Sequence, residues 1–416
     1  MRSPSAADLW AVLDRERLQS RLARLVQIPS ENPPGNELEA AELTAGYCRE
    51  LGFDVELHEA DAGRPSVVAR RSFGEGPTLA FCSHIDVVPA GDPSLWRVPP
   101  YGAVVEGDIL HGRGSADAKG PIAAALEAVA LLLAADVDMA GTLELDLVAD
   151  EEAMGFRGAG YLVEQGIVAP DVAVVGEPTS LRVVRAQRGA NWFRIYTHGL
   201  AGHGSAPERG INAIKHMAEI VLRLEEELPD VAHDVLGAPT LNVGTIAGGE
   251  KVNIIPAACV IEVDRRTIPG ETGESVRAGI ERAVERAKER FPDLNATVES
   301  AFSCSPFEVS DTSPVVTAAI AAVGDATDRP PEIIGFRGAS DARFLFEAGA
   351  DVIVLGPGDI ALAHTAREHI SLDELAQGAV AYALTFARLL DADSAYAGGS
   401  AGSVGRPVVA SGERDE

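Results

Sequence analysis

Short apolar runs that stop abruptly at polar residues are the dominant pattern in the first half of the chain. Three of them span residues 78–82, 143–149 and 172–175. Continuous apolar runs of this length are typical of strands buried on both faces in a parallel sheet. The stretch 121–135 is rich in Ala and Leu and is long enough for a helix. This alternation predicts an α/β fold in which helices cover both faces of a largely parallel sheet.

The pattern changes near residue 191. Alternating strands are predicted at 192–196 and 260–263, and amphipathic helices at 212–228 and 274–291. These elements indicate an inserted α+β domain.

The α/β pattern then returns, with a predicted helix at 313–322 and a predicted strand at 352–355. We therefore expect a first domain built from residues 1–190 and 304–392, interrupted by an insert at 191–303.

The end of the chain is rich in Gly, Ser, Ala and acidic residues. Because it has little apolar surface to bury, we expect residues 393–416 to form a disordered tail. The segment 398–402, Gly-Gly-Ser-Ala-Gly, matches the G-x-S-x-G pattern of a hydrolase nucleophile elbow. Such an elbow needs a strand before the serine and a helix after it, and neither is predicted here. We interpret the match as a coincidence of composition.

Charge and hydropathy disfavour several kinds of partner. The 63 acidic and 35 basic residues give a formal net charge of −28, which repels nucleic acid and anionic membrane surfaces. No apolar run reaches the roughly 18 residues that a membrane-spanning helix needs. The N-terminus lacks the basic-then-apolar order of a secretory signal and predicts an amphipathic helix capped by Ser5. We expect a cytoplasmic protein.

The four cysteines are scattered along the chain without any C-x-x-C pair: Cys48, Cys82, Cys259 and Cys304. They favour neither a disulfide framework nor a thiolate zinc site. Any metal must therefore use oxygen and imidazole ligands.

Chemically useful side chains follow the predicted strands at the points where these strands end. After the three apolar runs come, in order, His84 and Asp86, then Glu151 and Glu152, then Glu177. In open α/β sheets, ligands bind beyond the carboxyl ends of the strands. The sequence therefore predicts one shared site.

Two more candidates come from other segments. His364 follows the predicted strand at 352–355, and Asp117 ends a glycine-rich turn just before the predicted helix. An Asp at a helix start commonly caps the helix, and that role is compatible with metal binding. Asp86, two residues after His84, is a candidate to accept the second ring N–H of a ligating imidazole.

Each residue alone has a simpler explanation, such as a capping Asp, a hydrogen-bonded His or a solvated acid. Their joint occurrence at strand ends favours a metal site. Adjacent carboxylates at a buried edge repel one another unless a cation compensates. The expected ligands are His84, Asp117, Glu152, Glu177 and His364. Their three carboxylates set three negative charges against the four positive charges of two divalent ions, which leaves positive charge for a water nucleophile and an oxyanion.

Several segments together carry a resemblance to a known family. They are 83–89 (Ser-His-Ile-Asp-Val-Val-Pro), 112–120, 150–152 (Asp-Glu-Glu), 176–179 (Gly-Glu-Pro-Thr), 202–205 (Gly-His-Gly-Ser), 264–270 (Asp-Arg-Arg-Thr-Ile-Pro-Gly) and 363–364 (Ala-His). From about residue 20 to 390, the chain resembles the M20 metallopeptidase family of acetylornithine deacetylases, succinyl-diaminopimelate desuccinylases, aminoacylases and glutamate carboxypeptidases. The resemblance implies that the first domain is catalytic and that the insert is a lid or dimerisation domain.

The resemblance also implies which residue holds which metal. Asp117 would bridge two zinc ions, one of them also held by His84 and Glu177 and the other by Glu152 and His364. Cobalt or manganese would suit the same ligands.

By the same resemblance, Glu151 would be the general base that takes a proton from the attacking water and passes it to the leaving amine. The choice of Glu151 over Glu152 as the base rests on the resemblance alone. In the insert, His203 would reach the active site of the other subunit of a homodimer and stabilise the oxyanion. Arg266 would grip a substrate carboxylate with its forked guanidinium. Asn253 would be a further active-site contact.

Two features are ambiguous. His111 stands where many relatives carry an aromatic residue, and we interpret it as structural. The segment 338–343, Gly-Ala-Ser-Asp-Ala-Arg, resembles the version in desuccinylase-like and peptidase-like members rather than the Cys-Thr-Glu version of acetylornithine deacetylases.

The sequence thus predicts hydrolysis of the amide bond of an N-acyl amino acid or a related small amide. A di- or tripeptidase or carboxypeptidase with the same machinery is one alternative, and a non-catalytic binding protein that keeps the fold is another. Every expected ligand and base position is filled, which argues against the binding protein. We expect a small-molecule substrate and a homodimer formed through the insert, with neither nucleic acid nor membrane as partner.

Overall fold

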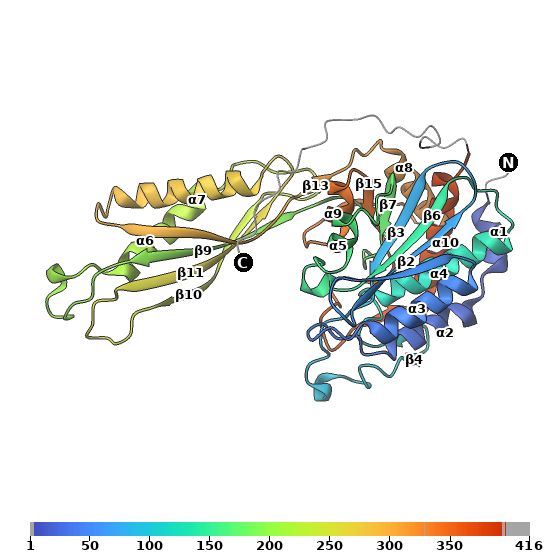
Figure 1. Cartoon of the computed structure of the whole chain (residues 1–416), viewed down its shortest axis with the longest axis horizontal. Helices are drawn as coiled ribbons and strands as arrows, with labels where there is room; N and C mark the ends of the chain where they lie inside the picture. The colour runs from blue at the N-terminus through green and yellow to red at the C-terminus, as the bar shows by residue number, and fades with distance from the viewer. Residues whose placement is uncertain (1–3, 328, 393–395, 397–416) are drawn as a thin grey trace. The chain divides into compact units, whose positions relative to one another are not determined.

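The computed structural model describes residues 4–327, 329–392 and 396 (Figure 1). The segment 398–402 and nearly all of the expected tail lie outside these residues. The chain forms two compact units. The first comprises the described parts of 1–185, 309–333 and 340–416, and the second comprises 186–308 and 334–339.

The first unit is built on a nine-stranded sheet of order β1-β2-β6-β3-β7-β15-β8-β13, with β14 joined to β8. Its four central strands run parallel: β6 (Thr142–Val148), β3 (Thr78–His84), β7 (Val172–Val175) and β15 (Asp351–Val354). Three of them are the predicted apolar runs, and their residues are almost entirely buried. The predicted α/β fold with a largely parallel sheet is confirmed.

The outer strands add antiparallel edges that the apolar runs did not predict. They are β1 (Asp54–Glu59), β2 (Pro65–Ser72), β8 (Val183–Gln187) and β13 (Phe307–Glu308). The branch strand β14 (Ile333–Phe336) pairs with β8. A separate small sheet joins β16 (His369–Ser371), β5 (Ile109–His111) and β4 (Val104–Glu106).

Helices cover both faces of the large sheet (Figure 1). One face carries α4 (Lys119–Ala134), α8 (Pro314–Thr327) and α10 (Leu372–Leu389), and the other carries α5 (Ala159–Glu164) and α9 (Ala342–Glu347). The remaining helices are α1 (Ala6–Val12), α2 (Arg15–Val26) and α3 (Leu38–Glu50). Phe81 of β3 packs edge-on against Tyr382 of α10, with ring centroids 5.2 Å apart. As predicted, the Ser5 side chain caps α1 by accepting the main-chain N–H of Asp8.

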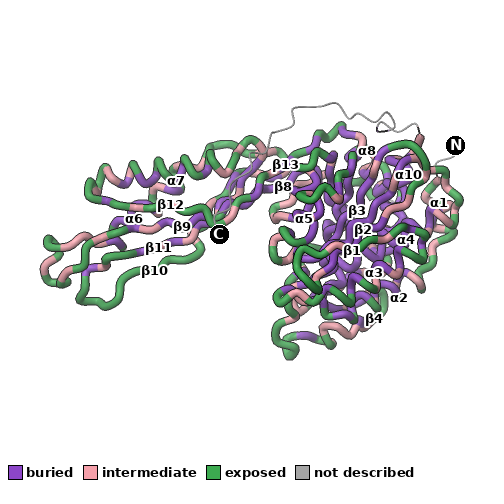
Figure 2. The backbone as a smooth tube through the Cα atoms, in the orientation of Figure 1, coloured by how far each residue is buried: buried purple, intermediate pink, exposed green. Residues whose placement is uncertain are grey.

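The second unit has a four-stranded antiparallel sheet of order β10-β11-β9-β12. Its strands are β10 (Thr240–Gly248), β11 (Ala258–Thr267), β9 (Gly189–His198) and β12 (Asn295–Cys304). Two amphipathic helices, α6 (Ala213–Leu224) and α7 (Gly273–Lys288), pack their apolar sides into one core with β9 and β11. Figure 2 shows buried positions alternating along β9 and β11, whereas the edge strand β10 is largely exposed.

No helix in the described part of the chain is both long and apolar enough to cross a membrane.

Candidate metal centre

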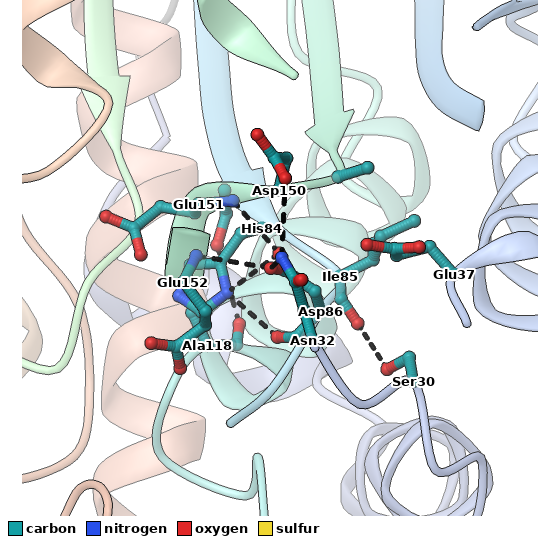
Figure 3. Close-up of polar contacts among 12 residues, drawn as sticks. Ser30, Asn32, Glu37, His84, Ile85, Asp86, Ala118, Asp150, Glu151 and Glu152 are labelled. Carbon is teal, nitrogen blue, oxygen red and sulfur yellow. Dashed lines mark hydrogen bonds and ion pairs between the residues drawn. The ribbon is translucent and has the colours of Figure 1, made fainter. Parts of the chain in front are cut away.

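The parallel register of the central strands gathers the predicted residues at one edge of the sheet. His84, the last residue of β3, lies opposite Val148, the last residue of β6. The acidic residues Asp150, Glu151 and Glu152 form the turn that follows β6, beside His84 (Figure 3). Asp150 has a φ of +70°, a left-handed conformation that a non-glycine residue adopts only where its surroundings hold it.

Asp117 lies at the centre of the cluster. Its Oδ1 is 3.1 Å from Nε2 of His84, and its Oδ2 is 3.3 Å from Nε2 of His364. Nε2 of His364 is also 3.0 Å from Oε2 of Glu152. The two oxygens of one carboxylate therefore face two different imidazoles, as a carboxylate shared by two neighbouring cations requires.

The helix after Asp117 leaves this carboxylate free for that purpose. The N-cap of α4 is Ala118, and no side chain caps the helix. The capping role considered for Asp117 is therefore not seen.

The tautomer of His84 suits a metal ligand. Its Nδ1 is 2.9 Å from the main-chain carbonyl oxygen of Asp86, which can only accept a hydrogen bond. Nδ1 therefore carries a hydrogen, and Nε2, which points toward Asp117, can offer a lone pair to a metal. The ligand atoms of His84, Asp117 and Glu152 lie within 4.8 Å of one another, a spacing at which they could hold one ion.

Burial disfavours the charged form of the carboxyl groups around these imidazoles. Burial, followed by the charge of Glu177, raises the pKa of Glu151 well above its usual value. Burial also raises the pKa of Glu152, and that of Glu177 well above its usual value. Buried carboxyls that crowd together in this way fit a site built for cations.

The pKa values of the two imidazoles are raised as well, which for a histidine favours the charged form. Burial disfavours the charged form of His84, but Asp117 and Asp86 outweigh it and raise the pKa of the ring well above its usual value. Hydrogen bonds to Asp117 and Glu152 raise the pKa of His364 to about 10. Both shifts reflect a surplus of negative charge around the rings, and the donor set fits divalent metal ions.

Asp86 contacts His84 as expected, but through its main chain. Its carbonyl, rather than its carboxylate, lies closest to His84 Nδ1, since the nearest carboxylate oxygen is 3.6 Å away. The carboxylate instead accepts the main-chain N–H groups of Glu151 at 3.3 Å and Glu152 at 3.2 Å. It also accepts a hydrogen bond from the Asn32 side chain at 2.9 Å (Figure 3). Asp86 therefore holds the acidic turn as well as the imidazole.

Some residues of the site were missed from the sequence. Glu368 is buried, is paired with Arg113, and accepts the main-chain N–H of Asp117 at 3.1 Å. Asp341 is fully enclosed, and burial raises its pKa to about 7. Arg113 lies in a segment that carried the resemblance and Asp341 in the ambiguous segment 338–343, whereas Glu368 gave no signal beyond standing four residues after His364.

The residues expected from the insert lie in the second unit. His203 and Asn253 are neighbours there, because His203 pairs with Ile254 and the N–H of Gly204 donates to the carbonyl of Asn253 at 2.9 Å. Both side chains are exposed. Arg266, on β11, is half-buried and lies 3.0 Å from the carboxylate of Asp264.

A second group of metal-binding side chains, His233, Asp234 and Glu308, also occurs among the described residues. Its imidazole is already engaged, since Nδ1 accepts the main-chain N–H groups of Val235 at 3.3 Å and Leu236 at 3.4 Å. His111, interpreted as structural, pairs with His369 across β5 and β16, with ring centroids 5.5 Å apart. The cluster around Asp117 is the better metal centre.

Comparisons with known proteins agree with the resemblance drawn from the motifs. The model of peptidase family M20/M25/M40 matches residues 80–388. The chain is 32% identical over 346 residues to acetylornithine deacetylase of Photorhabdus laumondii, covering 79% of this chain and 85% of the relative. It is 28% identical over 377 residues to succinyl-diaminopimelate desuccinylase of Hydrogenovibrio crunogenus, covering 88% and 97%. The crystal structure of aminopeptidase PepT from Bacillus cereus matches the fold with a TM-score of 0.75 at 24% identity, covering 90% and 98%.

Proposed function

The chain belongs to peptidase family M20/M25/M40 and is a metal-dependent hydrolase of amide or peptide bonds, and from that premise we propose that it removes the acyl group from an N-acylated amino acid. The observation that carries the proposal is the Asp117 carboxylate, whose two oxygens face His84 and His364. The curated relatives named acetylornithine deacetylase and succinyl-diaminopimelate desuccinylase support this substrate class.

We assign two divalent ions to the site. Asp117 would be shared between them, His84 and Glu177 would complete one set of ligands, and Glu152 and His364 the other. Imidazole and carboxylate donors suit zinc, and cobalt or manganese would also be accepted. When bound, the ions would supply the Lewis acidity that polarises the amide carbonyl and acidifies the attacking water.

Glu151 is the general base of the proposed mechanism. Burial and the charge of Glu177 raise its pKa well above its usual value, which makes the carboxyl a stronger base than an exposed glutamate. It takes the proton of the attacking water and then delivers it to the nitrogen of the leaving amine. Asp86 accepts the main-chain N–H of Glu151 at 3.3 Å and so helps to hold the turn that carries this carboxylate.

The second unit supplies the remaining contacts in this proposal. Nδ1 of His203 accepts the main-chain N–H of Ser205 at 3.2 Å, so the neutral ring carries its hydrogen on Nε2. That N–H is a suitable donor to the oxyanion that forms from the amide carbonyl. Arg266 would bind the substrate carboxylate, and Asn253, beside His203, would contact the substrate.

We further propose a homodimer formed through the second unit. Among the strands that the structure describes, the edge strand β10 pairs only with β11, so its other edge is open in this sheet. Sedimentation at the concentrations used for assays tests this proposal. We expect the mass of two chains, and the mass of one chain would contradict it.

A product assay tests the substrate class. Purified protein is incubated with N-acetyl, N-succinyl and N-formyl amino acids and with dipeptides, before and after removal of metal by a chelator. We expect release of the free amine from at least one acylated amino acid and loss of that activity with the metal. Hydrolysis of dipeptides alone would favour the peptidase alternative.

A further inference from the structure

The main chain of Asp117 is held by a carboxylate that is distant in the sequence. Oε1 of Glu368 accepts the N–H groups of Ala116 and Asp117, both at 3.1 Å. Glu368 is 1% exposed, so this contact is shielded from water. Because α4 begins only at Lys119 and has no side-chain cap, the helix offers these two N–H groups no other acceptor.

The other oxygen of Glu368 is matched by a cation. The Arg113 guanidinium donates to Oε2, and Arg113 itself is 3% exposed. The guanidinium lies over the ring of Trp96, 5.2 Å from its centroid, and the main-chain N–H of Arg113 donates to the carbonyl of Pro100 at 2.7 Å. A buried carboxylate with a fixed counter-charge is a rigid support for the groups that it accepts.

The neighbouring turn is built on the same principle. There, the carboxylate of Asp86 accepts the consecutive N–H groups of Glu151 and Glu152 at 3.3 and 3.2 Å. The turn that carries Asp117 and the turn that carries Glu152 therefore each have a buried carboxylate that accepts two successive main-chain N–H groups. Each carboxylate also accepts a hydrogen bond from a side chain: Asp86 from the Asn32 amide and Glu368 from the Arg113 guanidinium.

We propose that Glu368, paired with Arg113, is a positioning residue that fixes the Asp117 carboxylate between His84 and His364 and thereby sets the metal affinity of the whole centre. The inference rests on the proposed function. Because the two oxygens of Asp117 face the two halves of the site, a loosened main chain at this residue weakens both halves together. A residue that served only the stability of the fold would lower the melting temperature without changing the affinity of the folded protein for metal.

The matched control is a buried carboxylate with arginine partners elsewhere in the same unit. Glu127 of α4 has a fully buried side chain, receives hydrogen bonds from Arg17 and Arg21 of α2, and accepts the main-chain N–H of Asp14 at 3.4 Å. Its removal leaves the buried Arg21 without its counter-charge, as the removal of Glu368 leaves Arg113.

The test measures zinc binding to the chelator-stripped full-length protein by calorimetry, together with melting temperature, kcat and KM. We expect Glu368→Ala to weaken both zinc-binding steps by about 10- to 100-fold, the range found for residues that orient metal ligands, and to lower kcat while KM stays within about twofold. Glu368→Gln retains an oxygen acceptor for the two N–H groups but loses the charge, so it falls between wild type and Glu368→Ala. Glu127→Ala lowers the melting temperature and leaves zinc affinity within about twofold of wild type.

Wild-type zinc affinity in Glu368→Ala, or an equal loss in Glu127→Ala, would overturn the inference. If Glu368→Ala does not fold, Glu368→Gln and Arg113→Lys decide the matter, and unchanged zinc affinity in both overturns it. A wild-type protein that binds no metal and hydrolyses no amide would instead overturn the proposed function, so the two failures are distinguishable.

Discussion

Most of the candidate residues in the first unit are buried, with His364 the exposed exception, whereas His203 and Asn253 in the second unit are both exposed. In the first, His84 and Asp117 are 1% and 5% exposed, and the main-chain turns around them are tied to buried carboxylates. In the second, His203 and Asn253 lie on the surface, and the nearest partner of the His203 ring is Ser205, two residues along the chain. A site that holds several charged ligands together needs a rigid surrounding, whereas the proposed role of His203 and Asn253 is to contact the substrate only. Variants in the two units should therefore fail in different ways.

The largest effect is expected from the centre of the first unit. Asp117→Ala removes the carboxylate that faces both imidazoles, so metal content and activity should be lost together. We expect amide hydrolysis to fall by about 10⁴-fold or more, because several kcal/mol of transition-state stabilisation leave with the metal. Elemental analysis and the product assay on the same preparation measure both losses. Full metal content in this variant would contradict the proposal that the first unit holds the metal through Asp117.

Glu151→Gln should separate chemistry from metal binding within the first unit. The amide keeps the shape of the side chain but cannot accept the proton of the attacking water. We expect kcat to fall on the order of 10³-fold, within the range for loss of a general base, while metal content stays at the wild-type level. Stopped assays over hours on metal-analysed protein measure this loss. Hydrolysis at the wild-type rate would exclude Glu151 as the base.

His203→Ala carries the comparison to the second unit. Loss of an oxyanion donor costs kcat about 10²-fold, and metal binding should be untouched. Steady-state kinetics on this variant measures the loss of kcat, and zinc calorimetry measures metal binding. Weakened zinc binding would mean that the two units share the metal site, and an unchanged kcat would remove His203 from the mechanism.

The smallest effect is expected from Arg266→Ala. A charge-assisted hydrogen bond to a substrate carboxylate contributes about 1.5–3 kcal/mol, so KM should rise on the order of tenfold or more, with kcat little changed. A substrate whose carboxylate is converted to an amide is the matched probe, since the variant should lose its discrimination between the two. Equal KM values for wild type and variant would contradict the role of Arg266.

The sequence predicted those parts of the site that depend on local pattern. The apolar runs of β3, β6 and β7 were recognisable because both faces of each strand are covered, and their ends then located His84, Glu152 and Glu177. The antiparallel edge strands were not predicted, since β1 and β13 are partly exposed and lack a continuous apolar run.

Contacts between segments that are distant in the chain could not be predicted from the sequence. Glu368 and Asp117 are 251 residues apart, and no local pattern links them. Asp86 was expected to accept a hydrogen bond from His84, but the contacts of its carboxylate with the N–H groups of Glu151 and Glu152 could not be predicted. The bridging role of Asp117 and the choice of Glu151 as the base stay predictions that rest on family likeness and on this geometry.

In the proposed mechanism, a metal pair held around Asp117 in the first unit performs amide hydrolysis. The most direct measurement is a zinc titration of the chelator-stripped protein in which bound metal and product formation are followed together. We predict no hydrolysis before zinc is added and recovery as binding approaches two ions per chain, which matches the two sets of ligands that share Asp117. Full activity of the metal-free protein would contradict the account.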